Sequence, residues 1–202
     1  MKKKGSFVSS YGNLQKYRSK NLVVKILLNG FLKNLSRVVN SAKITDILDL
    51  GCGEGLVIDY LKKHNAELSF KGLDVSEEAI KMAKEINPQA NFKVGDIYKL
   101  EYEHNSFDLI MMIEVLEHLR YPERVLTKIK DISRKFFVFS VPREPYFSIG
   151  NFMRGKNMLR WGSDLEHLQW WTKSQFLKLI KEHFKIIEVK DAFPWIIVLC
   201  SR

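Results

Sequence analysis

The sequence has few of the residues that mark extracellular, zinc-binding or membrane-spanning proteins. Only Cys52 and Cys200 occur among its 202 residues, so neither a disulfide framework nor a cysteine-based metal site is expected. We expect both thiols to be reduced, in a cytoplasmic protein without a metal. No apolar run approaches the ~20 residues that span a bilayer. The first twelve residues hold three lysines but no apolar segment, which is unlike a secretory signal.

Acidic residues are missing from the first part of the chain. Residues 1–45 contain ten Lys or Arg and no Asp or Glu, whereas the other 157 residues contain 23 of each. The net charge of +10 is therefore concentrated in one segment, which favours an anionic partner such as nucleic acid or a membrane surface. Apolar residues recur at helical spacing over residues 22–39. That pattern favours a helix packed on the core, so we expect residues 1–43 to form a basic helical cap. The alternative is a basic amphipathic helix that contacts a membrane or RNA.

One stretch organises the remaining sequence, which we interpret as a single domain over residues 1–202. Residues 47–56 read ILDLGCGEGL: an apolar strand, an aspartate, three alternating glycines and the start of a helical pattern. Strand, glycine turn and helix open a doubly wound α/β sheet. A dinucleotide fingerprint would require glycine where Leu56 stands, and Glu54 would repel a pyrophosphate. Asp49 and Glu54 instead favour a ligand with an ammonium and a sulfonium, although an oxidoreductase remains an alternative.

Four ordered motifs, DLGCGEG, GLDVS, VGDIY and FDLIMMIEVLEHL, resemble those of class I S-adenosylmethionine-dependent methyltransferases. The resemblance covers residues 44–141. It implies a Rossmann-like sheet of seven strands in the order 3-2-1-4-5-7-6, with strand 7 antiparallel. It also implies S-adenosylmethionine as the cofactor and S-adenosylhomocysteine as the product. The EVLEH block resembles small-molecule O- and C-methyltransferases, including those of quinone biosynthesis. The VPREP and HLQWWT blocks resemble a subgroup of prokaryotic methyltransferases.

The resemblance also implies which residues bind the cofactor. At the expected end of the second strand, the Asp74 carboxylate would accept two hydrogen bonds from the ribose diol. Its alternative role is to support the turn before a helix that begins at Ser76. Asp96 would bind the adenine amino group, and Ile97 would pack near the ring. The full set of expected cofactor residues is Asp49, Gly51, Cys52, Gly53, Gly55, Asp74, Val75, Asp96, Ile97, Ile113, Glu114 and His118.

An insertion of about thirty residues, 142–172, precedes the expected helix over residues 173–183. It is rich in aromatic and basic residues, and a loop of that length in a compact domain is usually functional or disordered. We expect it to form a lid and an apolar acceptor pocket; the alternative is that its aromatic side chains only pack a satellite core. The expected acceptor-binding residues are Tyr17, Arg143, Trp161, His167 and Trp171.

Methyl transfer to oxygen or carbon requires removal of a proton from the acceptor. His118 and His167 are the candidate bases because imidazole titrates near neutrality, and Glu114 and Glu117 are weaker candidates. The sequence therefore predicts methylation of a small or lipid-like acceptor at oxygen or carbon. Two alternatives stay open: RNA or protein methylation that uses the basic N-terminus, and a non-catalytic S-adenosylmethionine-binding module.

Overall fold

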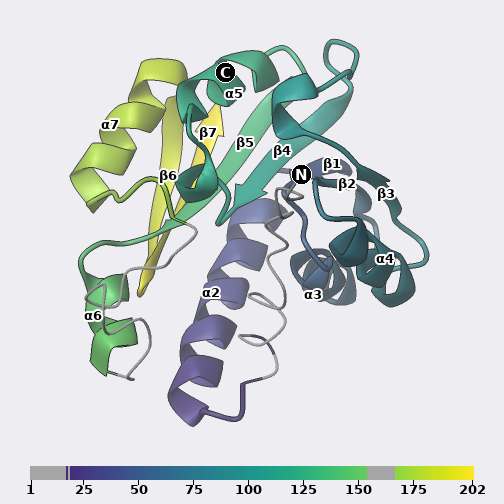
Figure 1. The fold of residues 1–202 in the computed structure, drawn as a ribbon. Helices are drawn as coiled ribbons and strands as arrows, with labels where there is room; N and C mark the ends of the chain where they lie inside the picture. The colour runs from purple at the N-terminus through teal and green to yellow at the C-terminus, as the bar shows by residue number, and fades with distance from the viewer. Residues whose placement is uncertain (1–16, 18, 154–166) are drawn as a thin grey trace, which may run out of the picture.

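The computed structural model describes residue 17, residues 19–153 and residues 167–202. Expectations for residues 1–16, 18 and 154–166, Trp161 among them, lie outside the described residues. A single sheet of seven strands runs through the molecule in the order β3-β2-β1-β4-β5-β7-β6, with helices on both faces (Figure 1). This order confirms the topology predicted from the sequence.

The helices and strands alternate along most of the chain. Short 3-10 helices follow β3 and β4. In chain order the elements are α2 (Leu22–Asn40), β1 (Asp46–Leu50), α3 (Leu56–His64), β2 (Ser69–Asp74), α4 (Glu77–Ile86), β3 (Asn91–Val94), η1 (Ile97–Lys99), β4 (Phe107–Ile113), η2 (Leu116–His118), α5 (Pro122–Ile129), β5 (Ser133–Pro142), α6 (Tyr146–Met153), α7 (Lys173–His183), β6 (Lys185–Ala192) and β7 (Trp195–Ser201).

The direction of the strands determines where a ligand can bind. β1 pairs in parallel with both β2 and β4, and β7 runs antiparallel to both β5 and β6. The chain leaves β1 toward β2 and β3 on one side and later returns to β4 on the other. In open α/β sheets, ligands bind in the crevice outside the carboxyl ends of the strands at such a reversal. The turns after β1 and β4 are therefore the expected ligand-binding edge.

The hydrophobic core forms two clusters, one on each face of the sheet. On one face α2, α3 and α4 cover the sheet; there the Phe31 ring is fully buried and lies 5.2 Å, centroid to centroid, from the ring of Trp195. On the other face α5 and α7 cover the central strands. β4 reads FDLIMMI and is buried along nearly its whole length, as expected for a central strand covered on both sides.

Helix α2 confirms core packing over most of its length. The Asn21 side chain accepts hydrogen bonds from the backbone N–H groups of Val23 and Val24 and caps the helix. From Leu28 onward its apolar face is buried. The first turn differs from the prediction: Leu22 belongs to the apolar pattern over residues 22–39, yet its side chain is 70% exposed. No helix among the described residues is long and apolar enough to cross a membrane.

One predicted boundary was wrong. The helical pattern that starts at Pro122 predicts a helix over residues 122–133, but α5 ends at Ile129 and Ser133 begins β5. The prediction extended too far because apolar residues continue at helical spacing to Ile132, which is buried in a turn after the helix has ended. The insertion also contains the helix α6, which the sequence analysis did not predict.

Candidate cofactor site

The turn between β1 and α3 is held in a conformation that requires glycine. Gly51, Gly53 and Gly55 have φ values of 79°, 51° and 72°, in the left-handed region that side chains disfavour. A Cβ at Gly51 would also lie 2.5 Å from Cγ2 of Val115. The backbone N–H groups of Gly51 and Cys52 both donate to the Leu73 carbonyl, which holds the turn against β2. The turn therefore presents bare backbone at the sheet edge where a ligand is expected.

Asp49 places a carboxylate beneath this turn. Its side chain is 2% exposed, and Oδ1 is buried without a hydrogen-bond partner among the described residues. Burial and the nearby charge of Asp74 raise the pKa of Asp49 to about 7. An unsatisfied buried acceptor costs about 1–3 kcal/mol, so its persistence here indicates a donor that arrives with a ligand.

Asp74 performs the structural role that the sequence analysis left as its alternative. Its Oδ2 accepts from the N–H of Gly53 at 2.8 Å, and its Oδ1 accepts from the N–H of Ser76 at 2.9 Å. Ser76 in turn caps α4 through the N–H of Ala79. A carboxylate has about four acceptor positions, so these two bonds leave room for a ribose diol.

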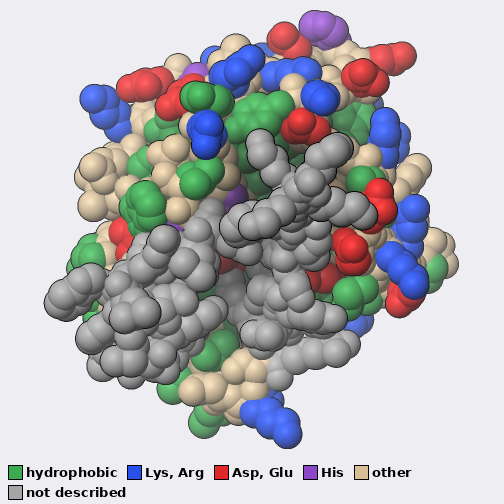
Figure 2. Space-filling view, in the orientation of Figure 1, with side chains coloured by type: hydrophobic (Ala, Val, Ile, Leu, Met, Phe, Trp, Pro, Cys, Tyr) green, Lys and Arg blue, Asp and Glu red, His purple; other side chains and the backbone are tan. Residues whose placement is uncertain are grey.

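The charged residues of the pocket around the turn are all acidic. The pocket is lined by Tyr17, Asp49, Gly51, Cys52, Glu54, Leu56, Val57, Ile113 and Glu114. Among these described residues three are carboxylates and none is Lys or Arg. The pKa of the Tyr17 phenol is raised by burial first and then by the charges of Glu114, Asp49 and Glu54. Figure 2 shows acidic side chains on the right of the visible face, with Lys and Arg side chains among them. The pocket therefore suits a cationic group and disfavours a phosphate.

Five of the expected cofactor residues line this pocket, together with residues that were not expected there. Asp49, Gly51, Cys52, Ile113 and Glu114 line the pocket as expected. Glu54 was considered only for its charge, and Leu56 and Val57 only as helix residues. Glu54 lies within the glycine turn, and Leu56 and Val57 follow it directly, so their position in the sequence was the signal for their place in the pocket.

Glu114 is held in a left-handed conformation, with a φ of 56°. Its N–H donates to both the carbonyl and the hydroxyl of Ser140 on β5, at 3.0 and 3.2 Å. A non-glycine residue in this region costs of order 1–3 kcal/mol and is more common at functional sites. The strain turns the chain at the carboxyl end of β4, so that Glu114 faces the pocket.

The remaining expected cofactor residues lie outside the pocket lining. Asp96 caps η1 by accepting the N–H of Tyr98 at 2.9 Å. Ile97 is half-buried against the core, and Val75 is 76% exposed. His118 ends η2, beyond Glu114. Nothing in these contacts assigns the residues to adenine or ribose, so their roles stay predictions.

Expected acceptor residues have structural contacts of their own. The Arg143 guanidinium lies 3.6 Å from the Asp191 carboxylate and 4.9 Å from the Tyr146 ring centroid. The Trp171 ring packs against Phe176 in the core. His167, in contrast, lies beside His118, with ring centroids 5.0 Å apart, and both remain candidates for the reacting centre.

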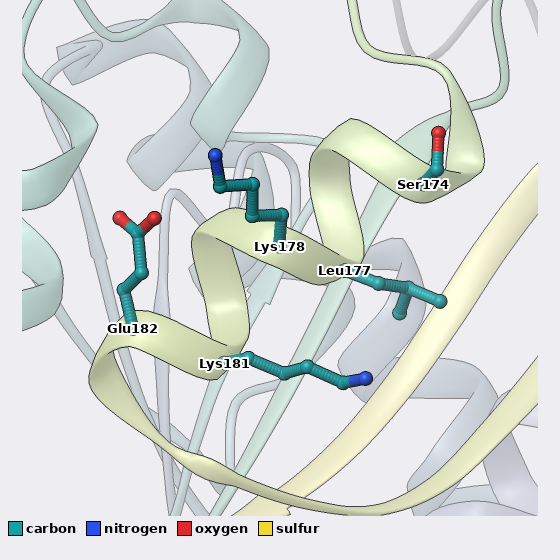
Figure 3. A pocket seen from close by; sticks show the side chains of 5 residues that line it. All are labelled: Ser174, Leu177, Lys178, Lys181 and Glu182. Atoms are coloured by element: carbon teal, nitrogen blue, oxygen red, sulfur yellow. The ribbon is translucent and has the colours of Figure 1, made fainter.

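A second hollow lies away from this edge, along the outer side of α7 (Figure 3). Its lining residues, from Ser174 to Glu182, all belong to that one helix. Groups that converge from several elements are typical of binding sites, and this hollow has none among the described residues.

Comparison with known proteins agrees with the geometry. Residues 48–136 match the family described as "Methyltransferase domain". This central part of the chain is similar to methyltransferase domains. The matched region includes the glycine turn, Asp74, Asp96, Glu114 and His118, and ends before α6. The domain implies S-adenosylmethionine as cofactor, and the glycine cradle, the buried Asp49 oxygen and the acidic lining fit that group.

Curated relatives align over the same part of the chain. A ubiquinone biosynthesis O-methyltransferase of Coxiella burnetii is 38% identical over 84 residues, which is 40% of this chain and 35% of that protein. A norajmaline N-methyltransferase of Rauvolfia serpentina is 33% identical over 92 residues, 43% of this chain and 31% of that protein. The chain thus spans about a third of the length of these curated relatives.

The solved structures extend the likeness in fold to nearly the whole chain. Magnesium protoporphyrin IX methyltransferase of Synechocystis PCC 6803, solved with bound S-adenosylhomocysteine, superposes with a TM-score of 0.68. The superposition covers 94% of this chain and 92% of that one at 16% identity. At that identity the likeness concerns the fold alone.

Proposed function

We propose that this protein transfers the methyl group of S-adenosylmethionine to a small-molecule acceptor, at oxygen or carbon. The observation that carries the proposal is the acidic pocket at the glycine turn, in which a buried Asp49 oxygen has no partner among the described residues. The ligand's ammonium and sulfonium would be stabilised by this lining, whereas a dinucleotide phosphate would be repelled.

The protein's own groups would each hold part of the cofactor. The glycine turn would receive the amino-acid portion near Asp49, and Asp74 would bind the ribose hydroxyls. Asp96 and Ile97 would contact the adenine. When bound, S-adenosylmethionine supplies an electrophilic methyl carbon on a sulfonium. The protein's contribution is to align the acceptor with that carbon and to exclude water, which can supply much of the reduction in barrier.

The acceptor side is proposed to lie where the turn after β4 meets the end of the insertion. Residues on that side are Tyr17, which lines the cofactor pocket, and His118 and His167, which face each other. The names of the curated relatives, a quinone O-methyltransferase and an alkaloid N-methyltransferase, support a small organic acceptor. The two free, buried cysteines support a reducing, cytoplasmic location.

A calorimetric titration with S-adenosylmethionine, S-adenosylhomocysteine and NAD tests the cofactor assignment. We expect micromolar binding of the first two and none of NAD. Asp74→Ala should weaken both at least tenfold, whereas Glu103→Ala, an exposed carboxylate away from the pocket, should leave them unchanged. Binding of NAD alone would contradict the proposal. Cofactor binding without turnover on any hydroxylated or carbon-acid acceptor would instead favour the non-catalytic module.

RNA methylation is the second candidate, because the first 45 residues carry ten basic residues and no acidic ones. Lys25, Lys33 and Arg37 of α2 are all exposed on the described helix. RNA binding would weaken steeply with salt, since each neutralised phosphate releases counterions. The test is a titration of the protein with RNA at about 50 and about 200 mM salt. If RNA does not bind at either salt concentration, RNA methylation is excluded.

A further inference from the structure

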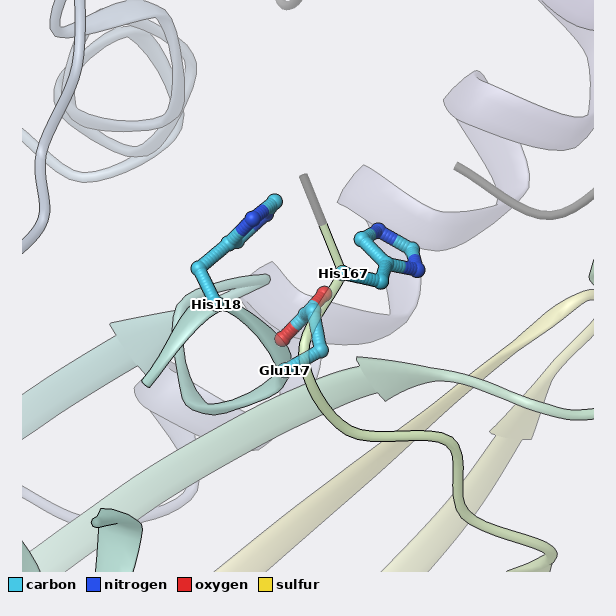
Figure 4. Close-up of side chains that lie close together, drawn as sticks. All are labelled: Glu117, His118 and His167. Carbon is cyan, nitrogen blue, oxygen red and sulfur yellow. The ribbon is translucent and has the colours of Figure 1, made fainter. Parts of the chain in front are cut away.

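Glu117, His118 and His167 bring one carboxylate and two imidazoles together at the end of β4. One ligand atom from each residue lies within 4.8 Å of the others. Figure 4 shows the Glu117 carboxylate between the two rings, whose planes are inclined at 78°. Glu117 and His167 are 2% and 7% exposed, and His118 is half-buried. The group is thus enclosed on most sides and reachable from the side of His118.

Main-chain hydrogen bonds fix the two segments that carry these residues. The Glu117 carbonyl accepts the N–H groups of Leu168 and Gln169, at 2.8 and 3.0 Å. The Gln169 side chain donates to the Leu119 carbonyl at 3.2 Å. The segment after the insertion is thereby held against η2, and His167 is placed beside His118 by backbone contacts rather than by chance proximity of two long side chains.

We propose that Glu117, His118 and His167 form a binding site for a divalent transition-metal ion. Imidazole binds zinc, iron, nickel and copper, and two imidazoles with one carboxylate are a frequent donor set for zinc or ferrous iron. Three protein ligands leave coordination positions open, as in catalytic rather than structural sites. The sequence analysis expected no metal, because it examined cysteine spacing and weighed each histidine separately.

The distances in the group are close to those of a metal site. Ligand atoms at ~2.1 Å from an ion lie roughly 3–3.5 Å from one another, so the present span requires a contraction of about 1–2 Å. Of the three side chains His118 is the least buried. An imidazole lone pair that binds a metal is unavailable as a base, so this role would replace the proton-accepting role expected for the same histidines.

The site's role in the reaction rests on the proposed function. An open coordination position would bind an acceptor hydroxyl and lower its pKa, as metals do for bound water. The hydroxyl proton would pass to solvent, and the oxygen lone pair would form the bond to the methyl carbon. The electron pair of the carbon–sulfur bond would return to sulfur, giving neutral S-adenosylhomocysteine. Glu114 lines the cofactor pocket three residues before Glu117, so donor and acceptor would meet at the end of β4.

The test is titration of untagged, chelator-stripped protein with Co²⁺, followed by calorimetry and visible absorption. We expect one equivalent to bind, with absorption bands of protein-bound Co²⁺ that added Zn²⁺ removes. His167→Ala and Glu117→Gln should weaken binding at least a hundredfold. His104→Ala, which removes an exposed histidine in a turn, should leave it unchanged. His118→Gln is a further variant at the half-buried position, in case a buried substitution prevents folding.

Each variant is also titrated with S-adenosylmethionine, which separates the two proposals. Cofactor binding without Co²⁺ binding by the wild-type protein would overturn the metal site and leave the proposed function standing. Co²⁺ binding without cofactor binding would do the reverse. Equal Co²⁺ affinity in the wild-type protein and in all three ligand variants would place the ion elsewhere and refute the assignment.

Discussion

Ionisation of Asp49 should make S-adenosylmethionine affinity depend on pH. In the ligand-free protein, burial and the Asp74 charge hold the pKa of Asp49 at about 7. A cationic ligand binds the carboxylate form, so affinity scales with the ionised fraction of Asp49. That fraction is about 3% at pH 5.5 and about one half at pH 7.0, by the relation between pKa and charge. The dissociation constant should therefore fall roughly fifteenfold over this interval, about 1.6 kcal/mol.

The measurement is a series of calorimetric titrations between pH 5.5 and 7.0. The upper limit avoids the α-amino group of the ligand, which titrates near pH 7.7–8.0. Asp49→Asn keeps the shape of the side chain but cannot ionise, so its affinity should be nearly independent of pH. A flat profile in the wild-type protein, or the same slope in Asp49→Asn, would refute the reasoning that places Asp49 beside the cationic ligand.

The raised pKa of Asp49 also makes the stability of the ligand-free protein depend on pH. Cofactor affinity should rise with pH, whereas this stability should fall. The pKa of Asp49 is higher in the folded protein than the ~3.9 of an unfolded chain, so the folded state holds its proton over a wider range. Stability of the ligand-free protein should therefore fall as pH rises from about 4 to about 7. At pH 8, Asp49→Asn should melt above the wild-type protein when no ligand is present, and a lower melting temperature would contradict the assignment.

Substitutions at three positions test the parts of the fold that place the site. Gly51→Ala should lower the free energy of unfolding by about 1–3 kcal/mol and weaken cofactor binding, because residue 51 has a φ of 79° and an alanine Cβ there would clash with Val115. An unchanged melting temperature and an unchanged cofactor affinity would contradict this prediction. Glu114→Gly should be about 1 kcal/mol more stable than Glu114→Ala in urea unfolding, since only alanine keeps the strain of the left-handed conformation. Phe31→Ala should cost about 3–5 kcal/mol in the same assay, because the ring is fully buried beside Trp195; a cost below 1 kcal/mol would show that α2 does not support the core.

The sequence was sufficient to place the glycine turn and Asp74 at one edge of the sheet because both lie in short, contiguous motifs. The glycine turn follows one strand, and Asp74 ends the next, so sequence order alone places them at one edge of the sheet. Helix α7 was also predicted with its observed bounds, residues 173–183, and the structure shows that it begins at a Thr172 capping box. A helix or strand could be predicted wherever its own residues, without contacts to distant segments, determine its type and its bounds.

Other features depend on contacts between distant segments and could not be predicted locally. The left-handed conformation of Glu114 is held by Ser140 on a neighbouring strand. Helix α6 follows Pro145 and contains Gly150, so its propensity is weak. The Glu144 carboxylate accepts from both the N–H and the hydroxyl of Ser148 and stabilises the first turn. The available signal was Pro145 with Glu144 before it and Ser148 three residues after it.

The boundary of the family match falls between the two halves of the proposed site. Residues 48–136 include Glu117 and His118, but His167 lies after the insertion, outside the match. A protein that shares only the matched region would therefore share the lining of the cofactor pocket except Tyr17, and two of the three proposed metal ligands. The third ligand depends on how the segment after the insertion is held to Glu117 through Leu168 and Gln169. The choice of acceptor would accordingly be determined by a part of the chain that can change while the cofactor site stays constant.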